Sequence, residues 1–304
     1  YYRNRWAGTD ETIHLMKFAI NIINFGDCGD ALTLAELART AEEVGWDGFF
    51  VWDHIAWDGR IMPMVDPGVA LTAIATSTNR IRIGAMVTPL PRRRPWKFAR
   101  ETVSLDHLSS GRMIVGVGIG DALAEFKSLG EVADLKTRGA MLDEGLQVVS
   151  GLWRGKPFSF SGEHYTVKDA HFIPATLQQP RIPIWVGGKW PNRAPFRRAA
   201  RWDGVFPILS GTDVKTYPAQ IQEMMQFLLD HRESDDPFDV TVQGTTPGND
   251  LMHAAEVVGE YADAGVTWWQ EAINENRPDL IDRASKTSWL DAVRWRIQQG
   301  PPRI

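Results

Sequence analysis

The sequence predicts a (β/α)8 TIM barrel. Short, nearly uncharged apolar runs alternate with helical patterns from residue 16 almost to the end of the 304-residue chain, and eight of each can be counted. Three helical patterns end at Gly or Trp-Asp-Gly directly before a strand, in EEVGWDGFFV, AARWDGVFP and YADAGVTWW. Such tight connections leave function to the loops at the other end of the strands. The main alternative fold is a doubly wound open sheet.

The expected strands are continuous apolar runs, which is typical of parallel strands buried on both faces. They cover residues 17–22, 48–52, 81–87, 113–118, 184–187, 204–208, 238–243 and 266–270. The expected helices cover residues 34–44, 68–77, 96–108, 137–153, 194–201, 215–230, 250–264 and 279–298. We place one domain at 16–304 and expect residues 1–15 to be an N-terminal extension.

One segment does not fit the alternation of strands and helices. Residues 155–183 are rich in aromatic residues, turn residues and proline. We expect them to form an insertion after the fourth helix, packed over the barrel rim, where they would shape the substrate pocket.

Composition excludes several classes of protein. The net charge is −5, and no lysine-rich stripe or basic tail indicates nucleic-acid binding. Cys28 is the only cysteine, so we expect neither a disulfide framework nor a thiolate zinc site. A single cysteine also fits a cytoplasmic location, which we therefore expect. No apolar run reaches the roughly 18 residues of a membrane span. The histidines form no HxH or HExxH pattern and no GxSxG elbow occurs, so we expect no metal and no serine nucleophile.

A barrel places its chemistry after the carboxyl ends of the strands. Asp53 and His54 follow the second strand, between Trp52 and Trp57. His54 can exchange protons near neutral pH, so it is the first candidate for catalysis, although a structural histidine at a capped strand end has the same sequence pattern. The two tryptophans suit either the walls of a pocket for a flat ligand or the packing of the rim.

Three more strand ends carry candidate residues. They are Ala85 and Met86 on the third strand, Gly118, Ile119, Gly120 and Asp121 on the fourth, and Gly187 and Gly188 on the fifth. The fourth stretch lacks the spacing of a dinucleotide fingerprint, so we interpret its glycines as room for a planar group. The Gly187–Gly188 pair precedes a helix and is either a phosphate-binding turn or a plain turn.

Long stretches of this chain resemble luciferase-like flavin or deazaflavin oxidoreductases. They are AEEVGWDGFFVWDHI, NRIRIGAMVTPLPRRRPWKFARETVSLDHLSSGRMIVGVGIGD, PIWVGGKWPNRAPFRRAARWDGVFP and YADAGVTWWQE. The branch that uses coenzyme F420 is the more similar one. The resemblance implies a TIM barrel that holds F420, or alternatively FMN, at the carboxyl mouth, a small-molecule substrate, and a homodimer.

The resemblance also implies roles for individual residues. Asp53 and Trp57 would contact the cofactor, His54 would handle protons near the reactive ring carbon, and Asp121 would take the place of a family acid. The glycine-rich strand ends, Gly118 to Gly120 and Gly187 with Gly188, would hold the ring and the cofactor phosphate. A non-prolyl cis peptide behind the ring would fall near Ala85 and Met86.

Several alternatives stay open. Asp121 also suits a helix cap, and the Arg92–Arg94 run suits either the acidic tail of F420 or a solvated loop. The segment PILSGTD has no lysine to grip a substrate phosphate, which argues against glucose 6-phosphate. We therefore predict hydride transfer between F420 and a small organic substrate. An FMN-dependent monooxygenase, a silent flavin-binding barrel and a sugar-phosphate barrel without flavin are the alternatives.

Overall fold

Eight parallel strands form a barrel in the computed structural model, which describes residues 16–57, 60–121, 123–210 and 217–302. The strands are β1 (Lys17–Ile22), β2 (Gly48–Val51), β3 (Arg82–Ala85), β5 (Val115–Gly118), β8 (Ile184–Lys189), β9 (Gly204–Ile208), β10 (Asp239–Gly244) and β11 (Trp268–Ile273). Their order in the sheet is β3-β2-β1-β11-β10-β9-β8-β5, with the short β4 (Thr88–Pro89) beside β5. A parallel bridge between Ile83 and Met113 joins the two ends of the sheet, so the TIM-barrel prediction is confirmed.

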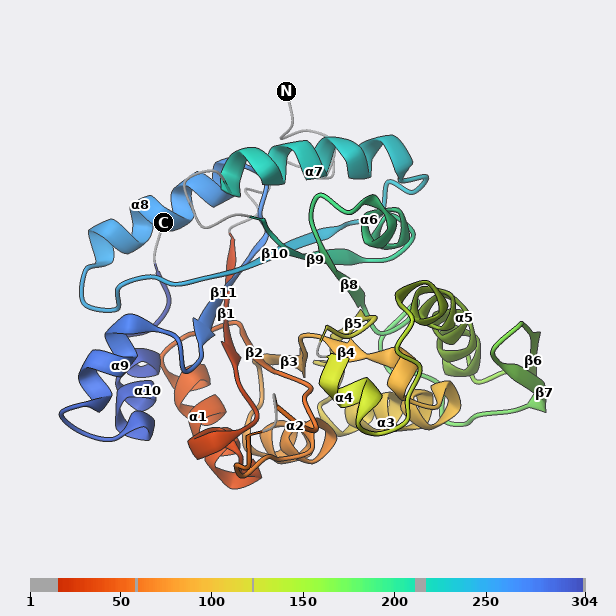
Figure 1. Ribbon diagram of the computed structural model, residues 1–304, viewed down its shortest axis with the longest axis horizontal. Helices are drawn as coiled ribbons and strands as arrows, with labels where there is room; N and C mark the ends of the chain where they lie inside the picture. Colours follow the sequence, from red (N-terminus) through yellow and green to blue (C-terminus); the bar gives the residue numbers. More distant parts are fainter. Residues whose placement is uncertain (1–15, 58–59, 122, 211–216, 303–304) are drawn as a thin grey trace.

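Helices surround the strands (Figure 1). They are α1 (Ala31–Glu43), α2 (Pro67–Ser77), α3 (Pro95–Leu108), α4 (Leu123–Lys127), α5 (Leu135–Trp153), α6 (Arg193–Ala199), α7 (Tyr217–His231), α8 (Leu251–Asp263), α9 (Pro278–Ala284) and α10 (Trp289–Gln298), with the 3-10 turns η1 (Gly26–Cys28) and η2 (Leu90–Arg92). Within the described ranges, no helix has the length and apolar character that a membrane crossing requires.

Alternate strand residues point into the barrel or out toward the helices. The inward side chains form a compact interior cluster of Ala19, Phe50, Met86, Ile114, Trp185, Phe206 and Trp268. Their outward neighbours belong to the larger core between the strands and the helices. Both faces of each strand are therefore buried, which explains the continuous apolar runs in the sequence.

The final predicted helix was wrong in one respect. Residues 279–298 form two helices, α9 and α10, instead of one. Ser288 is the reason, because it accepts a hydrogen bond from the amide of Asp291 at 3.1 Å and so starts a new helix. The short helix α4 was not predicted.

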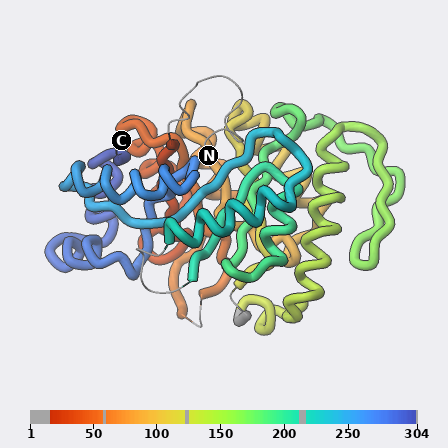
Figure 2. Tube along the Cα trace, turned by 90° about the horizontal axis from the view of Figure 1, so that it is seen from above, coloured from red at the N-terminus to blue at the C-terminus, as the bar shows by residue number. Residues whose placement is uncertain are grey.

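The insertion does not cover the rim as we expected. Strands β6 (Phe158–Ser161) and β7 (Thr166–Ala170) form an antiparallel hairpin, which lies outside α5 at the edge of the molecule (Figures 1 and 2). Glu144 on α5 accepts hydrogen bonds from three successive amides of the hairpin turn, Glu163 to Tyr165. The prediction that this segment forms a wall of the substrate pocket was therefore wrong.

Candidate active site at the carboxyl mouth

Three of the predicted strand ends meet around Val87. A Cβ atom built on Gly118 would lie 2.9 Å from one Val87 methyl group, and one on Gly187 would lie 3.1 Å from the other. The peptide bond between Met86 and Val87 is cis, which is one residue later than Ala85–Met86. The two glycines thus let the Val87 side chain pack closely against the ends of both strands.

His54 is fixed by a carboxylate that the sequence analysis missed. Its Nδ1 atom lies 3.2 Å from Oε1 of Glu125 on α4, and the same oxygen accepts hydrogen bonds from the amides of Ile55 and Ala56. A carboxylate can only accept, so Nδ1 carries a proton, and in the neutral imidazole Nε2 is the atom that can accept one.

Glu125 is ionised in this setting. Burial would raise its pKa, but hydrogen bonds from His54, Ala56 and Ile55, together with the charge of Arg92, outweigh burial and lower the pKa to about 2. The Arg92 guanidinium donates to the second carboxylate oxygen at 2.6 Å. A second acid four residues after Asp121, in DALAE, was the available sequence signal.

Asp53 is also held by arginines. Its side chain is only 1% exposed, and its two oxygens accept hydrogen bonds from Arg92 and Arg93 at 2.8 to 3.0 Å. The sequence analysis considered the arginine run either as a site for the acidic tail of F420 or as a solvated loop. Both interpretations need correction for Arg92 and Arg93, because each guanidinium group is paired with a buried carboxylate and is not a free solvated cation. They neutralise Asp53 and Glu125 and fix the β2 loop that carries His54.

Asp121 lies apart from this network. Its carboxylate pairs with Nζ of Lys189 at 2.8 Å, and both side chains are mostly exposed. The pair joins the end of β5 to the end of β8 across the mouth. The structure therefore places Asp121 at the rim, partnered by a lysine.

The tryptophans belong to an aromatic cluster beside His54. The Trp57 ring stacks on Phe25 with centroids 5.1 Å apart and meets the His54 ring edge-on at 4.5 Å. The Trp52 ring lies 5.7 Å from the same histidine. Flat aromatic side chains therefore cover one side of His54.

Gly187 and Gly188 lie inside β8, not at a helix start. Helix α6 begins only at Arg193. The prediction that their amides form a helix N-terminus is therefore wrong. Both glycines are closely packed, since an added Cβ atom would lie 3.1 Å from Val87 at Gly187 and 2.2 Å from Pro195 at Gly188.

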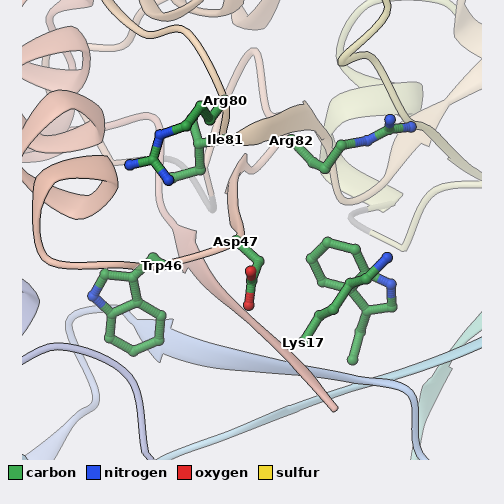
Figure 3. A pocket seen from close by; sticks show the side chains of 7 residues that line it. Lys17, Trp46, Asp47, Arg80, Ile81 and Arg82 are labelled. Carbon is green, nitrogen blue, oxygen red and sulfur yellow. The ribbon is translucent and has the colours of Figure 1, made fainter. Parts of the chain in front are cut away.

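A separate pocket lies at the opposite end of the barrel (Figure 3). Its lining includes Lys17, Asp47, Arg82 and Trp268, at or just before the amino ends of their strands. The interior cluster separates it from the mouth. Among the described residues, no group of three histidine, cysteine or acidic side chains could hold a metal ion.

A family model described as luciferase-like monooxygenase matches residues 16–294. The chain belongs to this family. A relative, the F420-dependent glucose-6-phosphate dehydrogenase of Microbacterium testaceum, is 32% identical over 192 residues, which are 62% of this chain and 55% of that protein. The oxygenase component of the flavin-dependent trigonelline monooxygenase of Acinetobacter baylyi is 26% identical over 202 residues, 66% of this chain and 52% of that protein.

Solved structures of other proteins share the fold. An F420-dependent secondary alcohol dehydrogenase in complex with an F420-acetone adduct superposes with a TM-score of 0.72 at 16% identity, over 84% of this chain and 93% of that one. The chain spans about half the length of the curated relatives that it matches.

Proposed function

We propose that this luciferase-like protein is an enzyme that transfers hydride between coenzyme F420 and a small organic substrate. The observation that carries the proposal is His54 after β2, which Glu125 holds through Nδ1 and which therefore has Nε2 as the atom that can accept a proton. The similarity to F420-dependent dehydrogenases supports the choice of cofactor.

The residues at the mouth fit a planar ring. At Gly118 and Gly187 the lack of a Cβ atom lets the Val87 side chain pack against the two strand ends, and these glycines with Met86 and Val87 form the surface that we call the ring cradle. We propose that these residues hold the ring, with Ala85, Ile119, Gly120, Gly188 and Trp57 as further contacts. The carboxylate of Asp53 is already occupied by arginines, so a contact from Asp53 would come through its backbone.

Bound F420 would supply the hydride acceptor or donor. The chain's own residues would orient the substrate, exclude water and move a proton. Nε2 of His54 would take the proton from the reacting group. Asp121, at the rim beside Lys189, would exchange that proton with solvent.

Replacement of His54 by alanine tests this role. We expect kcat for F420-linked turnover, followed at 420 nm with an alcohol or aldehyde found by screening, to fall roughly 10²- to 10⁴-fold, which is the usual contribution of a positioned acid or base. The Kd for F420 should stay within a few-fold of the wild-type value. Unchanged turnover by a variant that still binds F420 would contradict the catalytic role.

A monooxygenase that uses reduced FMN and oxygen is the second candidate, which the trigonelline monooxygenase relative favours. Substrate-dependent oxygen consumption with reduced FMN, and none with F420, would support it over our proposal. A barrel that binds flavin without turnover is the third. We also propose a cytoplasmic homodimer, which light scattering of the purified protein and localisation of a tagged copy would check.

A further inference from the structure

A chain of hydrogen-bonded side chains crosses the barrel interior near the mouth. Asn21 on β1 donates from Nδ2 to Oε1 of Gln270 on β11 at 2.6 Å. Gln270 in turn donates from Nε2 to the hydroxyl of Thr241 on β10, also at 2.6 Å. Asn21 Oδ1 accepts from the Trp52 indole at 2.6 Å and from Gln243 Nε2 at 3.2 Å.

The tryptophan fixes the direction of this amide chain. An indole N–H can only donate, so the Asn21 group that faces Trp52 must be the oxygen. The Asn21 nitrogen then faces Gln270, whose oxygen must accept and whose nitrogen must donate to Thr241. Reversal of either amide would set two donors or two acceptors against each other, so one arrangement remains.

Gln243 is the one member of the amide chain with an unused acceptor. Its nitrogen is committed to Asn21, so Oε1 must point elsewhere. No donor among the described residues bonds to this oxygen. Asn21, Gln270 and Thr241 are fully buried, whereas Gln243 is half-buried and precedes the last residue of β10, at the carboxyl edge of the barrel.

The amide chain and His54 both contact Trp52. Its indole N–H bonds to Asn21 and its ring lies 5.7 Å from the His54 ring. A substrate that reached from His54 to the carboxyl end of β10 would meet Gln243.

We propose that Gln243 accepts a hydrogen bond from a substrate hydroxyl group distant from the reacting carbon, and that Trp52 enforces this preference through Asn21. The proposal rests on the proposed function in that it assumes a small substrate at this mouth. An acceptor that cannot rotate favours a hydroxyl over an ether or carbonyl at the same place, because two oxygens without a proton between them repel each other. The substrate class is thus an alcohol that carries a second hydroxyl group.

The test compares trans-1,4-cyclohexanediol with 4-methoxycyclohexanol, which keeps one hydroxyl for His54 and blocks the other. Ligand-observed NMR titrations give both dissociation constants. We expect wild type to bind the diol roughly 3- to 10-fold more tightly, as one neutral hydrogen bond would allow. The ratio should fall to about one in Gln243→Met, which lacks the acceptor, and in Trp52→Phe, which lacks the donor that fixes Asn21.

Gln147→Met is the matched control, because it makes the same exchange at an exposed position of α5 outside the amide chain and should keep the wild-type ratio. A ratio near one in wild type, absence of diol binding, or an unchanged ratio in Gln243→Met would overturn the proposal. The titrations are run with and without F420. Failure of F420 to bind would count against the proposed function alone, since the ratio without cofactor tests Gln243 separately.

Discussion

Glu125 shows how one side chain sets the chemistry of another. One oxygen of its carboxylate accepts hydrogen bonds from Nδ1 of His54 and from two loop amides. Arg92 forms an ion pair with the other oxygen. The ring is thereby held in one tautomer with Nε2 available. His54 was recognisable from its place after a strand, but Glu125 was not, because nothing in a linear sequence shows that the loop after β5 folds back onto the loop after β2.

The charge of Glu125 predicts a pH dependence of stability. Its pKa lies at about 2 in the folded protein, below the ordinary value of 4.5, so the ionised form stabilises the fold. That contribution is complete above about pH 4.5 and is lost as the pH falls toward 2. We expect Glu125→Gln to lower the free energy of unfolding clearly at pH 6 and less at pH 3, in urea titrations followed by circular dichroism. An equal loss at both pH values would show that the charge is not what stabilises.

At the scale of elements, the strand ends were predictable and the loops between them were not. The apolar runs located all eight barrel strands to within a few residues, because strands buried on both faces have a simple pattern. Loop geometry depends on contacts between distant residues. The turn of the β6–β7 hairpin is held by hydrogen bonds to Glu144 on α5. Arg92 and Arg93 form ion pairs with the buried Asp53. Both sets of contacts join residues far apart in the sequence, so neighbouring residues do not predict them.

The glycine at the end of β5 offers a test of the ring cradle. Gly118→Ala would place a methyl group 2.9 Å from a Val87 methyl group, so Val87 in the ring cradle would have to move. We expect the Kd for F420 to rise at least about 10-fold, the effect of a lost or displaced contact of about 1.4 kcal/mol. Fluorescence titration measures it.

The matched control is Gly259→Ala on α8, where an added Cβ meets nothing within 4 Å. It should leave F420 binding unchanged. If Gly118→Ala binds F420 as tightly as this control does, the cradle does not lie beside Gly118.

At the scale of the molecule, a buried charge cluster joins the last strand to the last helices. Glu271 on β11 is fully buried and pairs with Arg277, just before α9, and with Arg296 on α10. The amide and hydroxyl of Thr246 donate to the same carboxylate. These contacts hold α9 and α10 against the barrel.

Removal of this carboxylate would leave the buried guanidinium group of Arg296 without its counter-ion, and would leave Arg277 paired only with Asp279. We expect Glu271→Ala to lower the free energy of unfolding by about 3–5 kcal/mol, the usual cost of breaking a buried ion pair. Glu36→Ala, which removes the exposed partner of Arg294 on the same helix α10, should cost at most about 1 kcal/mol. Urea unfolding of both variants measures the two losses in the free energy of unfolding. Similar losses would show that the buried ion pairs of Glu271 stabilise the fold no more than the exposed pair of Glu36 does.

We propose above that the barrel mouth holds a deazaflavin ring against His54. The most direct measurement is a titration of the purified protein with F420 and, in parallel, with FMN, followed by cofactor and tryptophan fluorescence. The account predicts saturable F420 binding in the micromolar range and no FMN binding. Tight FMN binding without F420 binding would contradict it and would favour the oxygen-dependent alternative.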